Sequence, residues 1–206
     1  MRTDVWQRIE RGLADGVQPD GESYAAPLAG GHVLLPLRRL EPGRRVASLI
    51  VNQAGFGVLD ALTDALARAL APHGIERVVG LPTLGLPVAE GVARRLGHDR
   101  LVPLGISRKV WYDAALSVPL ASSTTPGGGK RLYLDPRTRP LLTGRIALVD
   151  DVASSGASLA AALDLLALAG VRPVVLGVAM AQGAGWRARV DLPLEAALRT
   201  PILEDP

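Results

Sequence analysis

Short apolar runs alternate with amphipathic segments from residue 46 to residue 180. Apolar runs of this length, bounded by glycine or proline, are typical of buried strands. The expected strands are residues 47–51, 77–81, 101–105, 146–149 and 172–180. The expected helices are residues 56–71, residues 87–96 and a third segment that follows Ser158 and ends at Gly170. Strands that alternate with helices predict an α/β fold with a mostly parallel five-stranded sheet flanked by helices.

The first of these helices shows the pattern most clearly. Leucine and valine recur along one face of residues 56–71, as expected for a helix that packs on a core. Asp60, Asp64 and Arg68 follow another face at four-residue spacing, which predicts a solvated side.

Residues 1–45 fall outside this repeating pattern. They have a polar start, turn residues around 16–21 and an apolar patch at 32–37. We predict that residues 1–45 form a separate cap or short β segment and that residues 46–206 form the core domain. A chain of 206 residues is long enough to bury such a core.

Composition and charge exclude several classes of protein. Hydrophobic residues make up 48% and charged residues 21%, which is typical of soluble globular chains, and no apolar run reaches membrane-spanning length. The absence of cysteine excludes disulfides and thiolate zinc sites, and the three histidines are scattered. A net charge of +3 with only seven aromatics, and no basic block longer than two residues, favours anionic small molecules over nucleic acid. The expected compartment is the cytoplasm.

Residues 145–159 carry the richest chemistry. The apolar run 146–149 ends in two adjacent carboxylates, Asp150 and Asp151. A loop of small and hydroxylic residues then leads into an Ala/Leu-rich helix, and its members are Ala153, Ser154, Ser155, Gly156, Ala157 and Ser158. Small side chains let the backbone approach a ligand, and N–H groups at a helix N-terminus attract anions. The loop suits a phosphate, and the carboxylates should face sugar hydroxyls, a metal-bound group or a developing cation.

Simpler interpretations remain open for this loop and for a second one. The first could be a tight strand-to-helix turn with Ser158 as N-cap. The second, residues 80–85, offers backbone N–H groups and the hydroxyl of Thr83, but is also an ordinary Pro/Gly turn. Because ligands bind beyond the carboxyl ends of parallel strands, Thr83 and Asp150 are expected at the same edge of the sheet.

A long irregular segment, residues 107–143, separates the third and fourth strands. Segments of this length inside a compact domain are usually functional lids or disordered. Alternation at 116–121 and 131–134 predicts two arms of a β-hairpin, and glycine repeats at 127–129 between them.

Two residue pairs near the start of this segment are candidates for ligand contacts. Arg108 and Lys109 form a basic pair, which is either solvated or in contact with phosphate. Trp111 and Tyr112 either pack in the core, stack on a base or close a lid against water.

The motif at 146–159 resembles a known family signature. The order is an apolar strand, Asp-Asp, an apolar residue, any residue, two hydroxyl residues, Gly, any residue, a hydroxyl residue and an apolar residue. This order resembles the phosphoribosyl-pyrophosphate signature of type I phosphoribosyltransferases. Ser155 and Ser158 stand where threonine is more usual, and both keep the hydroxyl. The resemblance covers roughly residues 46–180 and implies the type I fold, with an N-terminal hood at 1–45 and a hairpin lid within 107–143.

The resemblance also implies a reaction and a set of roles. The expected function is transfer of the phosphoribosyl group of phosphoribosyl pyrophosphate to a nitrogenous base, a purine, with release of pyrophosphate. Magnesium is the expected cofactor, reached by the two aspartates mostly through substrate or water. The expected catalytic residues are Asp150, Asp151 and Lys109. The expected substrate-binding residues are Ala153, Ser154, Ser155, Gly156, Ala157, Ser158, Thr83, Leu84, Gly85, Arg108, Trp111 and Tyr112.

Two further expectations complete this interpretation. A homodimer is expected, with no membrane or nucleic-acid partner. The alternative class is a regulator that binds phosphoribosyl pyrophosphate without turnover, although no DNA-binding helix pair is evident. A Walker-type nucleotide site is excluded because the chain has no Gly-x-x-x-x-Gly-Lys-Ser/Thr motif.

Overall fold

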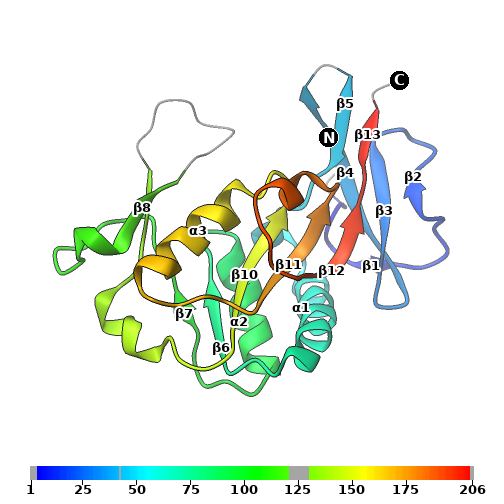
Figure 1. The fold of residues 1–206 in the computed structure, drawn as a ribbon. Helices are drawn as coiled ribbons and strands as arrows, with labels where there is room; N and C mark the ends of the chain where they lie inside the picture. The colour runs from blue at the N-terminus through cyan, green and yellow to red at the C-terminus, as the bar shows by residue number, and fades with distance from the viewer. Residues whose placement is uncertain (1–3, 42, 121–129, 205–206) are drawn as a thin grey trace.

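The structure is a computed structural model that describes residues 4–41, 43–120 and 130–204. These residues form a parallel sheet flanked by helices, an antiparallel sheet beside it and a two-stranded hairpin (Figure 1). The strands of the five-stranded parallel sheet, from edge to edge, are β12 (Leu194–Thr200), β11 (Val175–Gln182), β10 (Ile146–Ala153), β6 (Arg77–Gly80) and β7 (Val102–Pro103). The prediction of an α/β fold with a five-stranded parallel sheet is confirmed.

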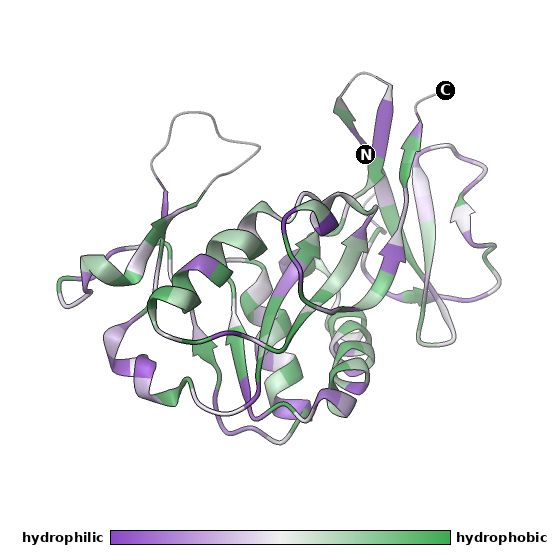
Figure 2. Ribbon diagram, viewed as in Figure 1, coloured by the Kyte–Doolittle hydropathy of each residue, from purple (hydrophilic) through white to green (hydrophobic). Residues whose placement is uncertain are grey.

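Helices bury both faces of this sheet. The helices are α1 (Phe56–Leu70), α2 (Gly85–Arg95) and α3 (Ala157–Leu168). On β10, Val149 packs in the cluster formed with α1 and α2, whereas Leu148 packs in the cluster formed with α3. Strand β11 is buried along its whole length and mostly apolar (Figure 2). Strands covered on both faces need continuous apolar runs, which explains why β10 and β11 could be recognised in the sequence.

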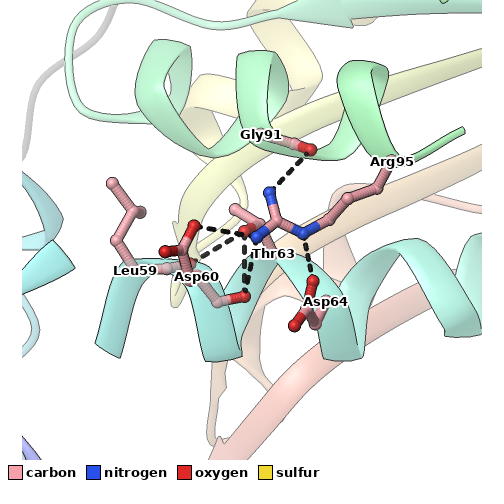
Figure 3. A network of polar contacts seen from close by, with 6 residues as sticks. All are labelled: Leu59, Asp60, Thr63, Asp64, Gly91 and Arg95. Atoms are coloured by element: carbon pink, nitrogen blue, oxygen red, sulfur yellow. Dashed lines mark hydrogen bonds and ion pairs between the residues drawn. The ribbon is translucent and has the colours of Figure 1, made fainter. Parts of the chain in front are cut away.

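An ion-pair network and a close backbone approach join α1 to α2 (Figure 3). The guanidinium of Arg95 on α2 pairs with Asp60, at 2.8 Å, and with Asp64, both on α1. A Cβ atom on Gly91 would lie 2.6 Å from Cγ2 of Thr63, so only glycine allows this distance between the helices. The helix side that carries the two aspartates is exposed, as predicted, but it also faces a partner helix. Exposed pairs of this kind contribute about 0–1 kcal/mol each.

The N-terminal residues form an antiparallel sheet that a late strand completes. Its strands are β1 (Ile9–Glu10), β2 (Gly16–Val17), β3 (Ser23–Leu28), β4 (Gly31–Glu41), β5 (Arg44–Ala47) and β13 (Ile202–Glu204). The order is β13-β5-β4-β3-β2, and β1 pairs with β4. The division of the chain at residue 45 stays a prediction, and strands β5 and β13 of this sheet extend past it.

The predicted strand at 47–51 is wrong. Strand β5 ends at Ala47 and belongs to the antiparallel sheet, and residues Val51–Gln53 form a 3-10 turn, η1. The fifth parallel strand is instead β12, which pairs with β11. The run 47–51 is apolar because Ala47, Leu49 and Val51 pack in the same cluster as α1, not because it lies in the parallel sheet.

The long segment after β7 contains the predicted hairpin. Strands β8 (Ser117–Pro119) and β9 (Arg131–Tyr133) pair antiparallel, and the N–H of Leu120 donates to the carbonyl of Lys130 at 2.9 Å. This confirms the two arms, whereas the glycines 127–129 lie outside the described residues. Short 3-10 turns complete the chain: η2 (Ala71–His73), η3 (Ala114–Leu116), η4 (Pro136–Leu141) and η5 (Gly185–Ala188).

Helix length bears on membrane insertion. Over the part of the chain that the structure describes, no helix is both long enough and apolar enough to cross a bilayer.

Candidate active site

A cavity of about 570 Å³ lies at the carboxyl edge of the parallel sheet, beyond β6 and β10. It is lined by Pro82, Thr83, Leu84, Ile106, Leu120, Lys130, Asp150, Asp151, Val152, Ser154, Ser155, Gly156, Ala157 and Ser158. A larger hollow of about 690 Å³ beside α2 and β7 has no serine or threonine in its described lining. The smaller cavity is the candidate active site, because it joins the aspartate pair to hydroxyl donors.

Residues Ser154 to Ser158 line this cavity at the start of α3, whereas Ala153 is buried at the end of β10 and is not among the lining residues. Helix α3 begins at Ala157, and its N-cap residue is Gly156, with a φ of +77° and no side-chain cap. The alternative in which Ser158 caps the helix is therefore wrong, because Ser158 already lies in the first turn. The N–H of Ala157 makes only a long hydrogen bond, 3.4 Å, to Oγ of Ser155. The first N–H groups of an uncapped helix favour an anion at this position.

The aspartate pair lies within the carboxyl-terminal half of β10, which continues to Ala153 and so extends past the predicted end of this strand at 149, and Asp150 lies against the loop that follows β6. Asp150 is 5% exposed, and its Oδ1 accepts a hydrogen bond from the N–H of Asp151 at 2.8 Å. Burial, and then the neighbouring charge of Asp151, raise the pKa of Asp150 well above its usual range. Burial also raises the pKa of Asp151. Two carboxylates in this environment favour a cation beside them, because an opposite charge restores their ionised form.

The loop after β6 closes one side of the cavity. Thr83 and Leu84 line it, and the peptide bond between Pro82 and Thr83 is cis. A Cβ atom on Gly85 would lie 2.6 Å from Oδ1 of Asp150 and 2.8 Å from its Cα. Glycine at 85 is therefore what lets α2 start directly against the aspartate. The predicted phosphate loop, aspartate pair and second loop are thus brought together.

The hairpin contributes a cation that the sequence interpretation missed. Lys130 lines the cavity with Ile106 and Leu120, whereas Arg108 and Lys109 are exposed outside its lining. Arg131 turns to the opposite side, where its Nε donates to Oγ of Ser117 at 3.1 Å. Neighbouring residues of a strand point to opposite faces, so the register of the hairpin decides which of Lys130 and Arg131 reaches the cavity.

Trp111 and Tyr112 pack at the foot of the hairpin and are not among the cavity-lining residues. Nε1 of Trp111 donates to Asp135 at 3.4 Å, and the guanidinium of Arg137 lies 4.8 Å from the centre of the Trp111 ring. The ring of Tyr112 lies 5.9 Å from that of Tyr133. Because Trp111 is 52% exposed and neither ring belongs to a core cluster, the core-packing interpretation is wrong: the two rings pack on neighbouring side chains at the surface, and a contact of either with substrate stays a prediction.

Asp113 and Asp135, two acidic residues of the segment 107–143, form hydrogen bonds within that segment. A hydrogen bond from Arg137 lowers the pKa of Asp135 to about 2. Asp113 caps the turn η3, where its carboxylate accepts from the N–H of Ala115 at 2.9 Å. Neither carboxylate lines the cavity.

The protein offers an oxygen-rich but incomplete site for a metal ion. Among residues 4–41, 43–120 and 130–204, no group of three or more histidine, cysteine or acidic side chains converges on one point. Asp150 and Asp151 are hard oxygen donors of the kind that magnesium prefers. They fit an ion whose remaining ligands come from substrate phosphates and water.

Comparisons with known proteins agree with this geometry. The phosphoribosyl transferase domain family matches residues 53–197. An adenine phosphoribosyltransferase of Streptomyces coelicolor is 33% identical over 165 residues, which cover 77% of this chain and 87% of the relative. A hypoxanthine/guanine phosphoribosyltransferase of Methanohalobium evestigatum is 27% identical over 185 residues, covering 82% and 93%.

Solved structures of low sequence identity show the same fold. An adenine phosphoribosyltransferase from Thermoanaerobacter pseudethanolicus has a TM-score of 0.58 at 18% identity, covering 69% of this chain and 81% of that one. An orotate phosphoribosyltransferase from Aeropyrum pernix has a TM-score of 0.55 at 23% identity, covering 79% and 85%. Because the family match extends over most of the sequence, the chain belongs to the type I phosphoribosyltransferase family.

Proposed function

We propose that this protein transfers the phosphoribosyl group of phosphoribosyl pyrophosphate to a purine base and releases pyrophosphate. The main support is the cavity that joins the uncapped, hydroxyl-rich start of α3 to the aspartate pair. The helix start suits the 5′-phosphate of the sugar. The carboxylates suit a ribose whose anomeric carbon becomes positively charged when pyrophosphate departs.

In this proposal Asp150 and Asp151 accept hydrogen bonds from the ribose hydroxyls and stabilise the oxocarbenium-like sugar. Their pKa values are raised by burial in the ligand-free site. A cationic sugar lowers both pKa values again, so the pair interacts more strongly with the transition state than with the ground state. Such differential stabilisation raises turnover rather than substrate affinity.

Pyrophosphate is held on the other side of the cavity. Backbone N–H groups and the hydroxyl at Thr83–Gly85 contact it, and this loop itself carries no basic side chain. Lys130 supplies the positive charge from the hairpin, because its side chain already lines the cavity. Arg108 and Lys109 follow the cavity-lining residue Ile106 closely in the sequence. They remain candidates for a second basic contact with pyrophosphate, and Lys109 is the proposed catalytic residue of the two.

Magnesium enters this site with the substrate. Asp150 and Asp151 would contact the ion mostly through ribose hydroxyls or water, because they form no cage of their own among the described residues. The bound ion would neutralise charge on the departing pyrophosphate.

The choice of a purine is supported by the names of the relatives, which are adenine or hypoxanthine/guanine phosphoribosyltransferases. Those same names are of enzymes, so they give no support to a regulator without turnover. Assembly as a homodimer stays a prediction, which analytical ultracentrifugation would test.

The direct test is release of pyrophosphate from phosphoribosyl pyrophosphate and magnesium, assayed separately with adenine, hypoxanthine, guanine, uracil and orotate. We expect release with at least one purine and none with the pyrimidines. Asp150→Asn is the matched control, since it keeps the shape of the side chain and removes its charge. Binding of phosphoribosyl pyrophosphate without release for every base would contradict the proposal and favour a regulator.

A further inference from the structure

The turn η5 lies directly against the phosphate-binding loop (Figure 1). A Cβ atom on Gly156 would lie 3.0 Å from both Cα and the carbonyl oxygen of Trp186. A Cβ atom on Gly185 would lie 3.2 Å from the carbonyl oxygen of Ser154. The two backbones therefore touch without an intervening side chain. Consecutive Cα atoms are about 3.8 Å apart, so the next residue, Arg187, starts close to the same loop.

Arg187 rests on a rigid platform. Its guanidinium lies 4.8 Å from the centre of the Trp186 ring, a distance at which the cation is attracted by the ring face. Trp186 is only 6% exposed and packs in the core with Leu159 and Ala162 of α3. In the described parts of the chain, no carboxylate pairs with Arg187. The backbone of η5 thus touches the loop, whereas the guanidinium of Arg187 lies on the face of Trp186, exposed and outside the lining of the cavity, with no carboxylate as its partner in the described residues.

The phosphate-binding loop contains no charged side chain. Residues 153–158 offer backbone N–H groups and neutral hydroxyls only. Lys130, the one basic side chain in the described lining of the cavity, comes from the hairpin on the pyrophosphate side. A sugar phosphate is close to a dianion at neutral pH, and charge-assisted hydrogen bonds to it are about twice as strong as neutral ones. Arginine is the residue best suited to supply them, because its planar fork matches a phosphate.

We propose that Arg187 binds the 5′-phosphate of the substrate, with the indole of Trp186 holding its guanidinium in place. This inference rests on the proposed function and adds to it a ligand from outside the signature loop. The turn η5 contacts the loop through its backbone and would then border the sugar-phosphate subsite, although none of its residues lines the cavity in the ligand-free structure. The side chain of Arg187 would have to turn from the face of Trp186 toward the start of α3 when the phosphate arrives.

The test compares Arg187→Gln with Arg189→Gln, an exposed arginine two residues further along the same segment. Titration calorimetry would measure ribose 5-phosphate, which carries the 5′-phosphate, and inorganic pyrophosphate, which reports on the other side of the cavity. Loss of a charged hydrogen bond predicts an increase in Kd for ribose 5-phosphate of about 10- to 100-fold in Arg187→Gln. Its Kd for pyrophosphate should stay unchanged, Arg189→Gln should match wild type for both ligands, and Arg187→Lys should recover part of the loss.

The outcomes separate this inference from the proposed function. A wild-type protein that binds neither ligand contradicts both. A wild-type protein that binds ribose 5-phosphate, with an Arg187→Gln variant of equal affinity, overturns the role of Arg187 and leaves the proposed function standing. Equal losses for ribose 5-phosphate and pyrophosphate, together with a lower Tm, would mean that Arg187 only stabilises the turn, and this also overturns the inference.

Discussion

Replacing Gly156 by alanine tests whether the start of α3 has to remain where the structure places it. The residue has a φ of +77°, and left-handed backbone costs a non-glycine residue about 1–2 kcal/mol. The new Cβ would also lie 3.0 Å from two backbone atoms of Trp186, which cannot rotate away. Overpacking of this kind adds about 1–3 kcal/mol. Gly156→Ala should therefore lower the free energy of unfolding by about 2–5 kcal/mol, or displace the loop from η5.

The control for this change lies at the other end of the same helix. Gly170 has a φ of +80°, but no atom lies within 4 Å of the Cβ that alanine would add. Gly170→Ala should therefore show only the backbone cost, about 1–2 kcal/mol. Urea unfolding of both variants would give the difference, and calorimetry with ribose 5-phosphate should show weaker binding for Gly156→Ala alone. Equal losses of stability, with affinity unchanged in both variants, would refute the idea that contact with Trp186 positions the loop.

Four other substitutions examine the remaining parts of the site. Burial raises the pKa of Asp150, so the folded chain keeps a proton that the unfolded chain loses above about pH 3.9. The free energy of unfolding should therefore fall as the pH rises from about 3.9 to the raised pKa of the folded chain. Asp150→Asn should flatten the dependence of Tm on pH and raise Tm at pH 7, while kcat falls about 100-fold or more; a steeper pH dependence would contradict the assignment. Lys130→Ala should weaken pyrophosphate binding about 10-fold by calorimetry, and a larger effect of Lys109→Ala would show that the wrong cation has been assigned. Ser155→Asp should abolish binding of ribose 5-phosphate by charge repulsion, with little change in Tm. Unchanged affinity for ribose 5-phosphate would refute the assignment of the phosphate to this loop.

The parts of the site that could be predicted are those whose signals are local. Strand β10, the aspartates in its carboxyl-terminal half and the small-residue loop before α3 all lie within 146–158. Their signals lie in the local sequence: apolar residues mark a strand buried on both faces, and glycine at 156 allows the positive φ at the start of α3. Their presence at one edge of the sheet then follows from the parallel topology, which also places Thr83 there.

The parts that could not be predicted depend on pairing between distant segments. An apolar run such as 47–51 specifies burial but not its partner, and here Ala47 pairs with Leu37 in an antiparallel sheet. Lys130 and Arg131 are chemically alike in the sequence, and only their register against β8 decides that Lys130 reaches the cavity. Trp111 stays at the surface, where it contacts Asp135 and Arg137, two residues that follow the hairpin in the sequence.

Strand β13 has a consequence for how the chain is synthesised. Ile202 of β13 pairs with Val46 of β5. One edge of β5 therefore stays unpaired during synthesis until every strand of the parallel sheet has been translated. Until then the nascent chain presents an open strand edge, and open edges promote pairing between different molecules. Deletion of residues 202–206 should keep that edge open permanently. Soluble yield on expression should therefore be more sensitive to these five residues than their distance from the cavity suggests.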